Sequence, residues 1–169
     1  MALPREFRLP LTLLGMAGAA VLAVSVAGAV QDRAPDRSQD IAWHNAQQAY
    51  LAKLTPTEGW QAMPGGLKWR RVAGDGSGPR PSPEDTVTVH YTGRFTDGTV
   101  FDSSVERGEP ATFPLGQLVK AWQMAIPQMG VGDTIEIAAP ADLAYGPMGR
   151  GPIPGGATLL FTVELLGIE

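Results

Sequence analysis

The residues of this sequence that could form a functional site are aromatic, with one carboxylate beside them. In the stretch VHYTGRFTDGTVFDSS, residues 89–104, the second of two short apolar runs ends in Phe101-Asp102. A carboxylate is an unexpected end for a strand that packs a core, because Asp is seldom fully buried without a partner. The aromatic residues that could line a pocket, or equally fill an ordinary core, are Tyr91, Phe101, Phe113, Trp122, Tyr145 and Phe161.

The composition argues against several other kinds of chemistry. The 169 residues include no cysteine, which rules out disulfides, thiolate catalysis and cysteine-ligated metal. His44 and His90 are far apart in unlike contexts, so we expect no histidine metal site and no cofactor. The net charge is −4, from 13 basic and 17 acidic residues without a basic cluster, which argues against nucleic acid as a partner.

Three of the candidate residues carry a local signal. Trp122 begins a predicted helix directly after a loop, where its ring could form the floor of a pocket. Tyr145 lies in residues 141–157, ADLAYGPMGRGPIPGGA, which are too rich in Gly and Pro for a helix or strand. Loops carry function more often than cores do, which favours a site role for Tyr145. Asp102, taken alone, is better explained as a turn or cap residue.

The first 30 residues predict export. Arg5 and Arg8 precede an uncharged stretch, residues 9–30, which closes with Ala27-Gly28-Ala29. This order of charge, apolar run and small residues is typical of a cleaved signal peptide. An uncleaved membrane anchor is the alternative, because a stretch of this length can span a bilayer.

Residues 31–65 predict a tether followed by a short helix. The polar start of this segment contains Pro35, and the helix is predicted for residues 40–54, DIAWHNAQQAYLAKL, ending before Thr55-Pro56. A helix of this length is marginal in isolation, so docking on the main domain is favoured over a free or dimerising helix. Its role is left open.

The main domain is predicted for residues 66–169. Alternation of apolar and polar residues predicts strands at residues 67–72, 86–92, 133–140 and 157–169. Asp97-Gly98 predicts a hairpin turn, and residues 118–129 predict a short helix whose length Pro127 limits. The expected fold is α+β, a twisted antiparallel sheet of five to six strands wrapped on one short helix, with the apolar segment and one extra helix before it.

Four blocks of the main domain resemble the FKBP-type peptidyl-prolyl cis-trans isomerases. They occur in the family's order, at residues 89–104, 113–122 (FPLGQLVKAW), 129–146 (MGVGDTIEIAAPADLAYG) and 153–169 (IPGGATLLFTVELLGIE). The helix followed by MPGGLKW, residues 63–69, is similar to the exported bacterial branch related to macrophage infectivity potentiator proteins. The long dimerisation helix of that branch is absent, so the oligomeric state stays open.

The resemblance implies a role for each candidate residue. Asp102 would face the twisting amide with Tyr91 hydrogen-bonded to it, and the Tyr145 hydroxyl would bond a substrate carbonyl; these three are the implied catalytic residues. Trp122 would be the floor beneath the proline ring, and Val119 would offer a backbone N–H. The full set implied to bind the substrate is Phe101, Phe113, Leu118, Val119, Trp122, Ile153 and Phe161.

Three positions depart from the family pattern. Ala111 stands where an aromatic residue is frequent, and Ala121 stands where glycine usually precedes the floor tryptophan. The loop from Tyr145 to Ile153 is about one residue shorter than in the best-known members, which affects where Arg150 and Ile153 lie. These departures bear on substrate preference and macrolide affinity.

The activity implied by the resemblance is isomerisation of X-Pro bonds in exported proteins, in the periplasm or at the inner membrane. Such rotation breaks no covalent bond and therefore needs no nucleophile, metal or general base. The implied partners are proline-containing polypeptides and, as a ligand, a macrolide of the FK506 type. The alternatives are a non-enzymatic chaperone or scaffold that holds proline segments, and a structural protein tethered by residues 9–30.

Overall fold

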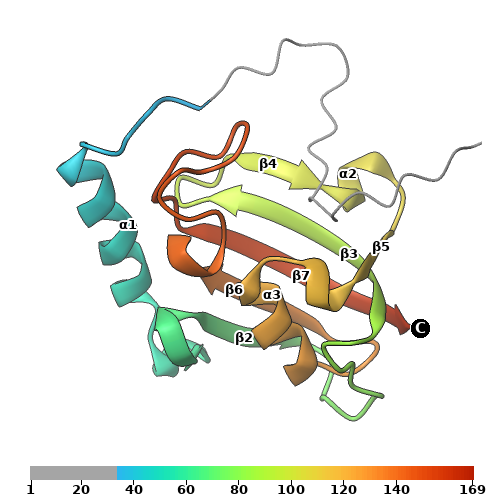
Figure 1. Cartoon of the computed structure of the whole chain (residues 1–169). Helices are drawn as coiled ribbons and strands as arrows, with labels where there is room; N and C mark the ends of the chain where they lie inside the picture. The colour runs from blue at the N-terminus through green and yellow to red at the C-terminus, as the bar shows by residue number, and fades with distance from the viewer. Residues whose placement is uncertain (1–33) are drawn as a thin grey trace, which may run out of the picture.

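One antiparallel sheet forms the framework of the computed structural model, which describes residues 34–169 (Figure 1). The predicted signal peptide or anchor lies outside these residues. Across the described range, none of the helices combines the length and apolar character that a bilayer crossing needs. The strands are β1 (Gln61–Ala62), β2 (Lys68–Ala73), β3 (Thr86–Phe95), β4 (Val100–Ser103), β5 (Ala111–Pro114), β6 (Thr134–Ala139) and β7 (Leu159–Ile168).

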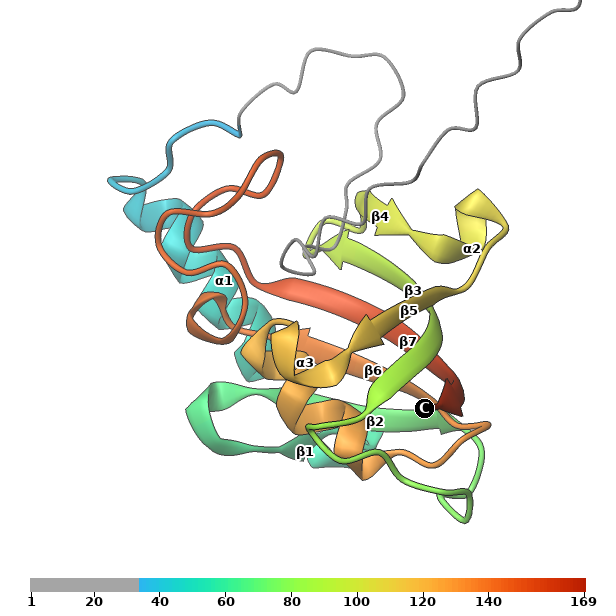
Figure 2. The ribbon, with the colours of Figure 1, turned by 45° about the vertical axis from the view of Figure 1, so that its right-hand side comes forward.

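The strand order is β1-β2-β6-β7-β3-β4, and β5 also pairs with β3. The α+β prediction of an antiparallel sheet wrapped on a short helix is confirmed, with seven strands where five to six were expected. The additional strand is β1, which has only two residues and pairs with β2. The helix α3 (Lys120–Ala125) lies across one face of the sheet, as Figure 2 shows, and a 3₁₀ turn containing Pro127 follows it.

Strand β3 is the central element of the site, and its alternation follows the prediction. Val87, Val89 and Tyr91 are buried on one face, because successive side chains of a strand point to opposite sides. At the end of this row Gly93 leaves room for an aromatic neighbour. A Cβ at Gly93 would lie 2.5 Å from the Cζ atom of Phe101, so only glycine leaves room for the far end of this ring.

Helix α1 (Ile41–Lys53) forms where it was predicted, and it docks on the domain. Asp40 caps it by accepting the Trp43 N–H at 2.8 Å. At its other end Lys68 of β2 donates to the carbonyls of Leu51 and Leu54, at 2.8 and 2.5 Å. A cation at the C-terminus of a helix complements the helix dipole. Docking, which the sequence favoured, is therefore confirmed.

One short helix, α2 (Ser104–Arg107), was not predicted. Ser103 begins it by accepting the Glu106 N–H at 3.2 Å, and Gly108 ends it in the left-handed conformation, with a φ of 73°. This single turn follows Asp102 directly. It returns the chain toward β3 and brings Arg107 back over the carboxylate of Asp102.

Candidate functional site

The polar centre of the site is a buried carboxylate held by two donors. Asp102 on β4 accepts the hydroxyl of Tyr91 at 2.5 Å with one oxygen and the Arg107 guanidinium with the other. Arg107 also donates to the Tyr91 hydroxyl oxygen at 3.0 Å. The Asp102 side chain is 1% exposed and that of Arg107 is 34% exposed, so the carboxylate is desolvated while its counter-ion reaches solvent.

The protonation states of this group follow from burial and contact. Burial, followed by the hydrogen bond to Asp102, raises the pKa of Tyr91 well above its usual range. Burial would lower the pKa of Arg107, but its hydrogen bonds to Tyr91 and Asp102 outweigh this, and its pKa is raised. At neutral pH Tyr91 is a neutral donor and Arg107 a cation. The arrangement therefore orients the Tyr91 hydroxyl and balances the charge of Asp102 with that of Arg107. It leaves no free base for proton transfer.

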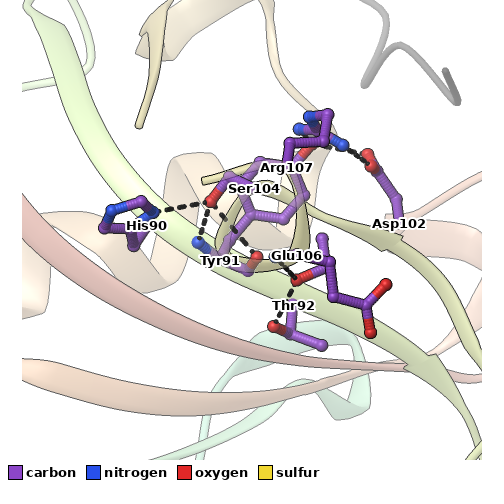
Figure 3. A network of polar contacts seen from close by, with 8 residues as sticks. His90, Tyr91, Thr92, Asp102, Ser104, Glu106 and Arg107 are labelled. Carbon is purple, nitrogen blue, oxygen red and sulfur yellow. Dashed lines mark hydrogen bonds and ion pairs between the residues drawn. The ribbon is translucent and has the colours of Figure 1, made fainter. Parts of the chain in front are cut away.

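Ser104 fixes the corner that carries this carboxylate. Its hydroxyl oxygen is fully buried, accepts the Tyr91 N–H at 2.8 Å and donates to the Tyr91 carbonyl at 3.3 Å. His90 contacts the same oxygen through Nδ1 at 3.1 Å (Figure 3). A buried hydroxyl with partners on both backbone groups of one residue locks the β4–α2 corner onto β3.

Beside the polar centre lies an aromatic cluster, and Trp122 is its middle. The Trp122 ring meets Tyr91 and Phe161 edge-on, with centroids 5.4 Å away in both cases, and Phe113 at 6.4 Å. Such edge-to-face pairs add to the stability that burial alone gives. The indole Nε1–H is buried and has no acceptor among the described residues. The aromatic cluster consists of Tyr91, Phe101, Phe113, Trp122 and Phe161.

Phe101 joins the polar centre to the aromatic cluster. Its ring stands edge-on to Phe161, with centroids 5.9 Å apart, and lies 5.0 Å from the ring of Phe95. Phe101 stays half-buried, as Phe113 does, whereas Trp122 and Phe161 are buried. The accessible part of the cluster is therefore its outer rings.

The N-terminus of α3 offers a free backbone donor. The Val119 carbonyl accepts the N–H of Trp122 at 2.9 Å, as the first turn of a helix requires. The N–H of Val119 donates to no other described residue. Leu118, just before it, is buried, and its carbonyl accepts Nε2 of Gln123 at 2.7 Å. Val119 thus presents the donor that the resemblance implies.

The site loop, residues 145–158, brings the remaining candidates. Tyr145 is half-buried, and its hydroxyl makes no hydrogen bond within the described part of the chain. Ile153 is buried and closes a small hairpin with Arg150, through backbone bonds of 2.8 and 2.9 Å. A cavity of about 970 Å³ lies between this loop and residues 34–38, and Ile153 lines it.

The structure brings the polar centre, the aromatic cluster and the Val119 donor into one packed region, and Tyr145 and Ile153 join the same core. Two residues of the site were missed from the sequence, Arg107 and Ser104. The only available signal for Arg107 was its position one helical turn after the Asp102 corner. Within residues 34–169, no cluster of three or more acidic or histidine side chains is arranged to hold a metal ion.

We expect the Tyr145 hydroxyl to make the protein less stable at high pH. Burial raises its pKa to about 12, with Arg150 opposing the shift and Asp102 adding to it, whereas a free tyrosine ionises near pH ~10. The stability that this difference contributes is fully present below pH ~10, and it is lost as the pH rises toward the pKa of Tyr145 in the folded protein. The free energy of unfolding, measured with urea across this pH range, should fall more steeply with pH for the native chain than for Tyr145→Phe. Equal slopes would contradict the burial.

Comparisons with known proteins agree with these observations. Residues 78–166 match the family model described as FKBP-type peptidyl-prolyl cis-trans isomerase. An Aeromonas hydrophila protein named FKBP-type peptidyl-prolyl cis-trans isomerase FkpA is 48% identical over 122 residues, 72% of this chain and 45% of the relative. The Legionella longbeachae outer membrane protein MIP is 42% identical over 122 residues, 72% of this chain and 52% of the relative.

The same similarity extends to a solved structure. The crystal structure of FkpA from Escherichia coli superposes with a TM-score of 0.73 at 36% identity, covering 78% of this chain and 62% of that chain. The chain spans about half the length of the curated relatives it matches.

Proposed function

The chain belongs to the family of FKBP-type peptidyl-prolyl cis-trans isomerases, and from this premise we propose that it accelerates rotation about X-Pro bonds in exported polypeptides. The observation that supports this most directly is the buried Asp102 carboxylate, held by Tyr91 and Arg107 beside an aromatic cluster. An orienting dipole next to an apolar, water-poor surface is what this reaction requires.

The proposed mechanism is preferential binding of the twisted amide. The barrier to rotation, ~18–20 kcal/mol, comes from the double-bond character of the C–N bond. An apolar surface disfavours the planar amide, which is the more polar form, and so it favours the twisted one. Each ~1.4 kcal/mol of such preference gives a tenfold rate, so ~5–7 kcal/mol brings a step of tens of seconds to milliseconds or below.

Each residue has a proposed part in that preference. Trp122 forms the floor under the proline ring, with Phe113 and Phe161 as walls, and Phe101 closes the side next to Asp102. The Val119 N–H and the Tyr145 hydroxyl, both without partners among the described residues, hold carbonyls of the substrate backbone. The fixed carboxylate of Asp102 acts on the amide electrostatically, because each of its oxygens is already held by a hydrogen-bond donor. The remaining substrate-binding residues are Leu118 and Ile153.

We further propose that the protein acts outside the cytoplasm. The uncharged segment of residues 9–30 supports export, and so does the likeness to a relative named an outer membrane protein. Fractionation of cells that produce the chain, followed by mass measurement, separates a cleaved periplasmic form from one anchored in the inner membrane. The proposed ligands are proline-containing polypeptides and a macrolide of the FK506 type.

The test of this function is the cis-to-trans rate of short X-Pro peptides with the full chain in a mild detergent. We expect strong acceleration, measured by exchange spectroscopy on the peptide so that no coupling protease is needed. A folded chain that binds the peptides without accelerating them would contradict the proposal and would identify a non-enzymatic proline-binding module instead.

A further inference from the structure

Helix α1, whose role the sequence left open, lies along the site loop (Figures 1 and 2). Three consecutive contacts join them on one side of the helix. Trp43 donates its indole N–H to the Gly155 carbonyl at 3.3 Å. The ring of His44 packs on Gly156, where a Cβ would lie 2.4 Å from its Cε1 atom. Gln47 receives the Thr158 N–H at 3.0 Å on its side-chain oxygen.

Gln47 is the buried polar side chain that α1 contributes to this contact, with 3% of its surface exposed. Its backbone carbonyl accepts the Thr158 hydroxyl at 3.4 Å, and its Nε2 reaches the Thr96 hydroxyl at 3.5 Å in the turn after β3. One side chain therefore joins α1 to both the site loop and the β3–β4 turn. Burying an amide is unfavourable unless it is bonded in this way, so the arrangement is specific.

The segment that α1 holds is connected directly to Tyr145. The Gly156 N–H donates to the Gly146 carbonyl at 3.0 Å, so the leg held by α1 is bonded to the residue after Tyr145. The legs are in close contact, since a Cβ on Gly155 would lie 1.9 Å from the Pro147 carbonyl oxygen. Moving residues 155–158 would therefore move Tyr145 as well.

We propose that Gln47 is a positioning residue, through which α1 sets the site loop, and with it the Tyr145 hydroxyl, against Asp102 and Trp122. This inference rests on the proposed isomerase function for its consequence in the rate. Gln47 lies on α1, away from the aromatic cluster, and its proposed effect on the rate passes through the site loop. A residue before the main domain thereby controls how well that domain holds the substrate backbone.

The test compares Gln47→Ala with Gln48→Ala in the full chain, because Gln48 is the exposed neighbour on the same helix. We expect Gln47→Ala to lower kcat/KM about five- to tenfold, through a higher KM, and Gln48→Ala to leave it unchanged. In a Tyr145→Phe background the loss from Gln47→Ala should shrink to about twofold or less, because both changes remove the same contact to substrate.

A purely structural role for Gln47 predicts a different pattern. It would lower the free energy of unfolding but leave kcat/KM unchanged at temperatures where the variant is folded, and this outcome would overturn the proposal. Full additivity with Tyr145→Phe would overturn it too. If Gln47→Ala does not fold, Trp43→Phe removes the donor to Gly155 and should show the same non-additivity with Tyr145→Phe.

An NMR readout separates failure of this inference from failure of the proposed function. The backbone amides of Tyr145 and Gly146 should shift or broaden in Gln47→Ala, while that of Val87, inside β3, should not. This measurement needs no catalysis. A chain without isomerase activity but with these shifts would refute the proposed function alone, whereas unchanged Tyr145 and Gly146 amides would refute the positioning role of Gln47.

Discussion

Replacing Asp102 by asparagine is expected to lower kcat/KM for X-Pro peptides about 10- to 100-fold. Asparagine keeps the shape of the side chain but presents an N–H₂ group to either Tyr91 or Arg107, both of which are donors. One donor must lose its acceptor, and the negative charge that faces the substrate disappears. The loss should appear mainly in kcat, because Asp102 is proposed to act on the twisted amide more than on the planar one.

The matched control for this variant is Asp97→Asn. Asp97 lies in the exposed turn between β3 and β4 and accepts the Thr99 N–H, at 2.9 Å. The Asp97→Asn substitution should leave kcat/KM unchanged. Exchange spectroscopy on the same peptide, with folding checked by amide spectra, measures both variants. A folded Asp102→Asn protein with native kcat/KM would remove Asp102 from the mechanism, whatever its part in stability.

Replacing Trp122 by alanine is expected to have the largest effect on stability, about 3–5 kcal/mol of the free energy of unfolding. The ring is fully buried and is the common neighbour of Tyr91, Phe113 and Phe161. Its removal leaves a cavity between these rings and takes away the proposed floor for the proline ring. Affinity for proline peptides should therefore fall together with stability.

Trp60→Ala separates the two effects. Trp60 is also buried, but it packs with Leu51 and Ala138 in a second cluster, apart from the aromatic cluster. Urea unfolding should show a large loss in the free energy of unfolding for both variants. Peptide titration, at a temperature where both are folded, should show weaker binding only for Trp122→Ala. Equal peptide affinities in the two variants would refute the proposal that Trp122 forms the floor under the proline ring.

The structural features that could be predicted from the sequence are those that depend on local periodicity. The row Val87, Val89 and Tyr91 follows from alternation along one strand, and α1 follows from helical spacing with Asp40 before it and Leu54 at its end. The choice of candidate aromatic residues was equally useful, because every one of them packs into a single core. For the strand and for the bounds of α1 the short-range pattern and the tertiary structure agree. The side that α1 buries, with Gln47 and Leu51, did not follow from the spacing.

The remainder could not be predicted because it depends on how elements meet. Arg107 reaches Asp102 only because α2 makes a single turn after β4, and nothing in the local pattern marked that turn. The pairing of Phe95 with Phe101 depends on the bare surface of Gly93. The hydrogen bond from the Thr158 N–H to the Gln47 side chain joins residues 111 positions apart in the chain. Contacts at such separation have no periodic signal.

The place of β7 has a consequence for the order in which the chain can fold during synthesis and export. This strand, Leu159–Ile168, lies between β6 and β3; it pairs with β3 along its length and with β6 over residues 159–164. Until it arrives, β3 and β6 have open edges and no sheet joins them. The complete sheet therefore cannot form until β7 has left the ribosome, because non-local pairing cannot precede its partner. This delay suits the proposed export, because a polypeptide whose sheet is incomplete can still be threaded through a membrane channel.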